Sequence, residues 1–474
     1  MVKSLYTPTP AIVKLWLLGL IFAFTRHCFV GILFVVMKKI ICLITAISLI
    51  SLSSSVWAQE NKGYILKQDV PEYLEVREPL GIGPLLKNII LLVDFEAFLT
   101  YSRLLDSKND TMGGSVSGSV APVYKINKQN YIIPFYSGQY NKSRQAITQE
   151  EGAQLYTETQ LHNTSLEYKH IVNDKLILKP NVFATWSFNK ETADEKWHSG
   201  LYDYHDLGGS FNATYQLKKQ GLKQSSVSLS SQYYRREYPH FQSLISLASI
   251  TAAETDEKDY DGIRNTLGYS YLNPDGLSLE ADYSLLLKIF IDKKVIGSDG
   301  VLKSDKRFDN EHTFDLNFKY SPPGALSYIL DNQYVLNISD QNFYDSLSTL
   351  SLSDDVFTKN YFNYQSYQAT PRLVYTKDLG RGKDMALVVD GGYSFLIRLY
   401  GDRKKQDGAG NYTNKDQLDF QHQVFGRVSY PLVKGLDLVF KGDYSIYKSN
   451  QLFDRYYKYN YDIYNVSVGI SYEY

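Results

Sequence analysis

The chain has 474 residues and is rich in aromatic side chains, with 41 Tyr and 23 Phe but only 4 Met and 4 Trp. Its formal net charge is −1, and residues 1–58 contain basic side chains but no acidic ones, so the rest of the chain is net acidic. Binding to nucleic acid requires a basic surface, and this charge balance excludes such a partner.

Residues 37–58 have the layout of a cleaved secretory signal peptide. A pair of lysines begins the segment, an apolar run follows, and a stretch of mostly small residues ends at Ala58. No Cys stands at the exit, which argues against a lipoprotein anchor. Residues 1–36 are also apolar but are interrupted by charges. Two interpretations remain open: an extra leader upstream of a start codon at Met37, or a true inner-membrane helix.

The exported part of the chain is expected to lack disulfides, because both cysteines, Cys28 and Cys42, lie in this leader. No apolar stretch of about 18 residues follows Ala58, so we expect no transmembrane helix there. Residues 59–88 include three prolines. They are too few for a plug domain, and we predict a short periplasmic segment.

From Ile89 onward the hydrophobic pattern has a period of two, which is typical of strands. In residues 436–447 one face carries Leu, Phe, Tyr and Ile, and the other face carries Asp and Lys441. Such runs reach the roughly nine to eleven residues that a tilted strand needs to cross a bilayer. Turning Lys441 toward lipid at mid-bilayer would cost about 2–4 kcal/mol, so the apolar face must point outward.

The pattern predicts sixteen strands, with fourteen as the alternative. The strands are 89–102, 113–125, 130–141, 159–171, 175–189, 204–218, 224–236, 262–272, 277–291, 310–320, 325–338, 360–376, 384–399, 416–430, 436–448 and 460–474. Short connectors such as the Asn173–Asp174 turn alternate with longer ones such as 292–309 and 400–415. This alternation is typical of short periplasmic turns and long extracellular loops. The predicted fold is therefore all-β, a transmembrane antiparallel up-and-down barrel over residues 89–474.

The end of the chain carries a spaced pattern of four residues: Ser467, Gly469, Tyr472 and Tyr474. It resembles the C-terminal assembly signal of Gram-negative outer-membrane β-barrel proteins, in which a polar residue and a Gly precede two aromatics at the very end. The resemblance covers eight residues. It implies location in the bacterial outer membrane, with outer-membrane lipid and the barrel-assembly machinery as partners. The strand number resembles that of porins and other sixteen-stranded channels, but no motif indicates a narrower family.

The charged residues on the polar faces of the predicted strands are expected to line an aqueous lumen. They are Asp94, Glu96, Glu280, Asp282, Lys288, Asp315, Lys319, Arg372, Asp390, Arg398, Asp419, Arg427, Asp437, Lys441 and Asp443. In a pore they would set selectivity by their charge. The alternative for any one of them is that it pairs with a neighbour and braces the wall. Both signs are present, so the sequence predicts neither cation nor anion selectivity.

Several aromatic residues are also expected on the inner face, where they either fill space or form a sugar-stacking track; filling is the favoured interpretation. They are Phe98, Phe183, Phe290, Phe425, Tyr447 and Tyr461. The connector 237–261 contains an apolar run and is the best candidate for a gating element. His198 and His205 lie close to Asp206, but their spacing fits no standard ligand pattern, so no metal site is predicted.

No set of catalytic residues is predicted. His162 and Ser165 lie close in sequence, but alternation along a strand points them to opposite faces. We predict a pore, without cofactor or enzymatic activity, for passive or facilitated passage of small hydrophilic solutes. The alternatives are a conduit for a hydrophobic or polymeric (polysaccharide) substrate and a surface adhesin that uses the long loops. The solute and the oligomeric state are not predicted.

Overall fold

The computed structural model describes a barrel that begins at Ile89. The described residues are 89–105, 110–145, 155–190, 192, 194–220, 223–241, 256–345, 356–380, 385–453 and 460–473. The predicted leader, signal peptide and periplasmic segment lie outside these ranges. Within the described part of the chain no helix is long and apolar enough to cross a membrane.

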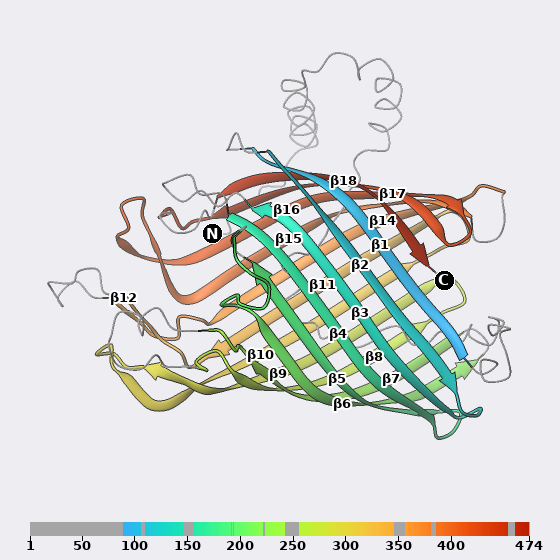
Figure 1. Ribbon diagram of the computed structural model, residues 1–474, viewed down its shortest axis with the longest axis horizontal. Coiled ribbons are helices and arrows are strands. Elements are labelled where there is room, and N and C mark those ends of the chain that lie inside the picture. The colour runs from blue at the N-terminus through green and yellow to red at the C-terminus, as the bar shows by residue number, and fades with distance from the viewer. Residues whose placement is uncertain are drawn as a thin grey trace, which may run out of the picture. The chain divides into compact units, whose positions relative to one another are not determined.

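In the described residues sixteen strands close into one antiparallel barrel (Figure 1). The elements are β1 (Ile89–Leu104), β2 (Asp110–Lys125), β3 (Asn130–Gln145), β4 (Leu155–Ile171), β5 (Leu176–Lys190), β6 (Tyr204–Gln220), β7 (Lys223–Glu237), β8 (Tyr260–Leu272), β9 (Leu277–Ile296), β10 (Leu302–Tyr320), β11 (Leu326–Ser339), β12 (Phe343–Asp345), β13 (Val356–Thr358), β14 (Tyr364–Asp378), β15 (Ala386–Gln406), β16 (Tyr412–Val433), β17 (Leu436–Ser449) and β18 (Tyr461–Glu473). Each barrel strand pairs with the next one along the chain, and β18 pairs with β1. The predicted sixteen-stranded up-and-down barrel is confirmed.

The strands β12 and β13 stand apart from the barrel wall. They form a two-stranded sheet inside the connector between β11 and β14, which are themselves neighbours in the barrel. The sequence prediction treated this connector as an irregular loop, so the small hairpin was missed. Three-residue strands carry too little alternation to be recognised from a hydrophobic pattern.

Two hairpins are longer than predicted. The strands β9 and β10 leave only residues 297–301 between them, and β15 and β16 leave only 407–411. The expected loops at 292–309 and 400–415 are therefore mostly strand, and both hairpins project at the end with the long connections (Figure 1). The apolar alternation stops in these extensions, but strand pairing continues with an irregular register, as between Leu302 and Ile296 and between Lys404 and Asp416.

Polar contacts stabilise both extensions. Lys306 Nζ lies 3.4 Å from Asp292 Oδ1 in the first hairpin. In the second, Asp407 closes the turn, where its Oδ1 accepts hydrogen bonds from the backbone N–H groups of Ala409 and Asn411 at 2.9 and 3.0 Å. The N–H of Asn411 is the main cause that lowers the pKa of the Asp407 carboxyl. The turn is thus held by a carboxylate that is ionised at neutral pH.

The turns at the opposite end are tight and depend on glycine. Gly276 has a φ of +83°, in the left-handed region that favours glycine. A Cβ at this position would overlap the carbonyl oxygen of Ser321 in the adjacent turn. The two neighbouring turns therefore approach each other more closely than a side chain at position 276 would allow.

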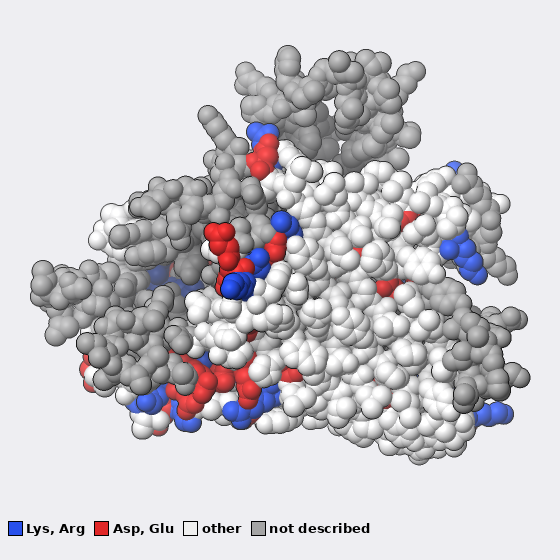
Figure 2. Space-filling view, viewed as in Figure 1, with Lys and Arg blue, Asp and Glu red and all other residues white. Residues whose placement is uncertain are grey.

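The face of the barrel in Figure 2 is mostly uncharged. In the face shown in Figure 2, Lys, Arg, Asp and Glu gather toward the end with the long hairpins, and few lie over the rest of the sheet. Along β18, for example, Val466, Val468 and Ile470 are exposed in succession. Such a surface is unfavourable in water.

Candidate functional site

Alternation along each strand separates an outer face from an inner face. In β1, Phe95 and Leu99 expose 37% and 55% of their surface. Between them Glu96 points the other way and contacts Arg427 of β16 and Lys441 of β17. The closed barrel leaves no backbone edge unpaired, and its outer face exposes rows of apolar side chains. Such a surface is stable in contact with the acyl chains of a lipid bilayer. The chain is a bacterial outer-membrane β-barrel protein.

The strand registers place all fifteen charged residues of the predicted lumen set on the inner face of the barrel. In the strand register Asp390 lies opposite Arg427, and Arg427 lies opposite Lys441. These three residues therefore lie in one row across β15, β16 and β17. Asp282 and Asp315 are likewise paired across β9 and β10. The role of the set in conduction remains a proposal.

One ionic cluster joins the two ends of the barrel sheet. Glu96 Oε1 lies 2.9 Å from Arg427 Nη2, and Glu96 Oε2 lies 3.6 Å from Lys441 Nζ. The Ser471 hydroxyl of β18 donates to Glu96 Oε1 at 3.2 Å. Lys441 Nζ also lies 3.4 Å from the ring centroid of Phe98. The Glu96 carboxylate of β1 thus forms ion pairs with one cation of β16 and one of β17, and these strands come close to β1 only because the barrel is closed.

Other members of the predicted set pair with neighbours. Arg372 Nη2 lies 2.7 Å from Asp390 Oδ2, and its Nη1 lies 3.6 Å from Asp331 Oδ2. Lys288 Nζ lies 3.6 Å from Glu311 Oε2. These contacts are the bracing alternative that the sequence left open, and they reduce the charge that Arg372 and Lys288 present to a solute.

A strip on β9 and β10 is acidic. Asp282 and Asp315 face each other directly across the two strands, and Glu280 lies two residues before Asp282 on the same face. Carboxylates in this arrangement repel each other. Gln333 donates from Nε2 to Asp315 Oδ1 at 2.8 Å and offsets part of the repulsion. The inner wall therefore has an acidic region on β9–β10.

Sequence reasoning missed a buried ion pair near the loop end of the wall. Arg236 of β7 donates from Nε and Nη2 to the two carboxylate oxygens of Asp206 of β6, both at 2.7 Å. The side chains are only 3% and 9% exposed. The rings of Tyr204 and Tyr260 lie 3.8 and 5.6 Å from the guanidinium carbon. Alternation alone places both residues on the polar face, but the register that brings them together was needed to see the pair.

The neighbouring histidine lies on the other face. His205 Nε2 is 2.9 Å from Glu237 Oε2, while Asp206 points inward. His205 and Asp206 therefore do not converge on a common point. In the described ranges there is no group of three or more His, Cys, Asp or Glu side chains that could hold a metal ion.

The predicted inner aromatics contact one another and the wall cations. Tyr447 and Tyr461 stack with ring centroids 4.4 Å apart. Arg307 lies 4.6 Å from the ring centroid of Phe290, and Phe183 packs beside it in one cluster. Phe425 is almost fully buried. These contacts favour space filling over a sugar-stacking track.

Two further predictions fall partly outside the described residues. The apolar run of the gating candidate 237–261 lies within 242–255, which is not described. In the assembly signal, Ser467 Oγ is 2.8 Å from Thr100 Oγ1, Gly469 packs against the backbone of Ala97, and Tyr472 lies in the outer row. Tyr474 is not described, and recognition by the barrel-assembly machinery remains a proposal.

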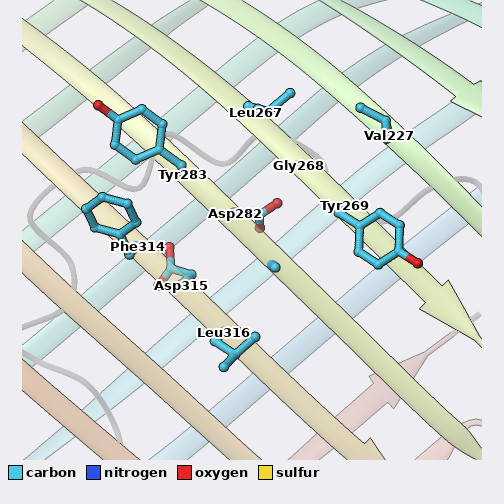
Figure 3. A pocket seen from close by; sticks show the side chains of 10 residues that line it. Val227, Leu267, Gly268, Tyr269, Asp282, Tyr283, Phe314, Asp315 and Leu316 are labelled. Atoms are coloured by element: carbon cyan, nitrogen blue, oxygen red, sulfur yellow. The ribbon is translucent and has the colours of Figure 1, made fainter.

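A hollow of about 410 Å³ lies on the outer face of β8, β9 and β10. The aromatic side chains of Tyr269, Tyr283 and Phe314 surround it (Figure 3). The wall there is set back because Ala281, which lies between Tyr269 and Leu316 in the register, has a small side chain. The hollow lies in the lipid-facing wall and is not part of the inner site.

The chain is similar to several solved structures of other proteins at low sequence identity. No protein-family model matches the chain, and no curated protein is similar to it. Similar solved structures include a loop L8 deletion mutant of OmpT, an outer membrane protein of Vibrio cholerae, with 10% identity over 82% of this chain and 100% of that chain and a TM-score of 0.40. Another is Acinetobacter baumannii OccAB3, with 10% identity, coverage of 81% and 99%, and a TM-score of 0.39. A third is Pseudomonas aeruginosa OccK2 (OpdF) in complex with glucuronate, with 11% identity, coverage of 82% and 97%, and a TM-score of 0.39.

Proposed function

We propose that this barrel is an outer-membrane pore through which small hydrophilic solutes pass down their gradient. The observation that carries the proposal is the inner face of a closed sixteen-stranded barrel, which collects charged side chains from strands all along the sheet. Eight-stranded barrels are just filled by their side chains, whereas about sixteen strands leave room for an aqueous channel. Charged groups on the inner face that are not buried in ion pairs are stable where water reaches them.

The same inner face argues against a hydrophobic cargo and against catalysis. A hydrophobic cargo would have to pass carboxylates such as Glu280 and Asp282 at an unfavourable desolvation cost. Catalysis would need a nucleophile, a base and a group that orients the base, and His162 and Ser165 lie on opposite faces of β4. We therefore propose passive or facilitated transport without a cofactor.

The direct test is electrical. Purified barrel inserted into planar bilayers of defined lipid is expected to give discrete, reproducible conductance steps in KCl. A barrel that is folded by circular dichroism but electrically silent at all voltages would contradict the pore. Liposome swelling with uncharged sugars of increasing size then gives the size limit of the solutes.

The acidic strip gives a prediction for selectivity. Neutralising it with Glu280→Gln and Asp282→Asn removes two negative charges from the inner wall. The cation-to-anion permeability ratio is expected to fall by about twofold, because wall charges set the local ion concentrations. The reversal potential in a KCl gradient measures the ratio.

The control for this prediction lies on the outer face. Asp261 of β8 accepts a hydrogen bond from the Tyr233 hydroxyl at 3.0 Å on the lipid side. Asp261→Asn removes a charge of the same kind and should leave the permeability ratio unchanged. An equal shift in the strip variant and in this control would show that the strip does not face the ion path.

A further inference from the structure

Two arginines of β15 have unused hydrogen-bonding capacity near the loop end of the inner wall. The Nε atoms of Arg398 and Arg403 are buried and have no hydrogen-bond partner among the described residues. A buried N–H without an acceptor destabilises the fold. Two such donors within six residues of one strand call for an acceptor that the described residues do not supply.

Tyrosine rings hold both guanidinium groups. The guanidinium carbon of Arg403 lies 4.0 Å from the ring centroid of Tyr361 and 4.3 Å from that of Tyr400. The guanidinium carbon of Arg398 lies 4.7 Å from the ring centroid of Tyr364, and the Tyr364 and Tyr400 centroids are 6.1 Å apart. The five side chains form one continuous row. Stacking through the faces of a guanidinium leaves its N–H edges for a ligand.

This row has an excess of positive charge. Arg398 lies opposite Asp419 in the register. That carboxylate also accepts hydrogen bonds from Ser449 Oγ at 2.6 Å and from Gln417 Nε2 at 3.1 Å. Arg403 has no ion pair with any residue that the structure describes, whereas the adjacent Lys404 is paired with Asp416. Among the described residues, Arg403 is therefore the cation of the row without a compensating carboxylate.

The row faces the inside of the barrel. Arg398 and Asp419 form a cross-strand pair on the inner face, and Tyr400, two residues later, is 8% exposed on the same face. Arg403 stacks on Tyr400 and so lies on this side too. A solute that enters from the end with the long hairpins would meet Arg403 before it meets the charged rows of β16 and β17.

We propose that Arg403, assisted by Arg398, binds the carboxylate of anionic solutes at the loop end of the lumen. The planar edge of a guanidinium presents two parallel N–H donors that match a carboxylate, and the tyrosine faces fix the plane in which it binds. The inference rests on the proposed pore function and names a solute class for it.

The test compares succinate with its uncharged analogue succinamide as blockers of single-channel current, each added to the loop side. Succinate is expected to reduce the current at lower concentration than succinamide. Arg403→Gln should weaken the succinate effect about tenfold or more. Arg403→Lys keeps the charge but loses the planar donor pair, and should weaken it by a smaller factor. Lys404→Gln removes the same charge at the adjacent, paired position and should leave the succinate effect unchanged.

Each outcome decides the proposal. Equal block of wild type and Arg403→Gln, or equal effects of succinate and succinamide, would overturn the site. Inorganic phosphate as strong as succinate would overturn the assignment to carboxylates. If the wild-type barrel conducts no current, the pore proposal fails by itself, and calorimetric titration of succinate into the detergent-solubilised barrel and into Arg403→Gln still decides the binding site.

Discussion

Replacing Gly469 with Val is expected to prevent closure of the barrel. Gly469 of β18 pairs with Phe98 of β1 at the seam between the two ends of the sheet. A Cβ at this position would overlap the carbonyl oxygen of Ala97 and press on the Phe98 ring. The backbone of β1 and β18 cannot move apart there without breaking hydrogen bonds between these two strands. We therefore expect the free energy of unfolding to fall by about 3 kcal/mol or more. The measurement is the fraction of heat-modifiable, folded protein in isolated outer membranes.

The control for this substitution is a glycine in the adjacent strand. Gly442 of β17 lies on the outer face, and a Cβ there would meet only the carbonyl oxygen of Asn465 at an ordinary 3.6 Å. Gly442→Val should therefore leave the folded fraction close to that of wild type. If Gly469→Val folded equally well, the seam would be looser than its packing indicates.

Replacing Arg236 with Met is expected to destabilise the barrel by about 3–5 kcal/mol, because it leaves the carboxylate of Asp206 buried without a partner. Both side chains are almost completely shielded, and the guanidinium is also held by Tyr204 and Tyr260. Met is close to Arg in length, so packing is largely kept and the lost interaction is mainly ionic. Urea unfolding from lipid vesicles, followed by intrinsic fluorescence, measures the change in the free energy of unfolding.

Two variants separate this ion pair from a general effect of charge removal. Arg235 is the next residue, 47% exposed on the outer face and paired with Glu237, so Arg235→Met should change stability by about 1 kcal/mol or less. The double variant with Asp206→Leu and Arg236→Met has no buried charge left and should recover most of the lost stability. A double variant as unstable as Arg236→Met would show that the lost packing of the guanidinium, and not the stranded carboxylate, causes the defect.

The strand pattern follows from the sequence because a bilayer imposes a simple rule on every residue. Lys441 and Leu438 must lie on opposite faces, because a charge in the acyl layer costs several kcal/mol and the period of a strand is two. Local alternation thus predicts which residues face inward and how many strands there are. Turn signals such as Gly276 mark where the chain reverses. None of this requires knowledge of which strands meet.

Contacts across the sheet depend on register and closure, which only the tertiary structure decided. Glu96 meets Arg427 across 331 residues of sequence, and no local pattern links them. The hairpin formed by β15 and β16 extends beyond the apolar belt, where lipid no longer constrains the residues and polar pairing replaces the hydrophobic alternation. Arg403 lies in that extension, and its stacking on Tyr361 joins two segments whose alternation carries no signal. Contact with lipid restricts the residue types on the outer face, so the sequence itself shows the alternation. On the inner face, water tolerates many residue types, and only three-dimensional proximity decides which side chains contact one another.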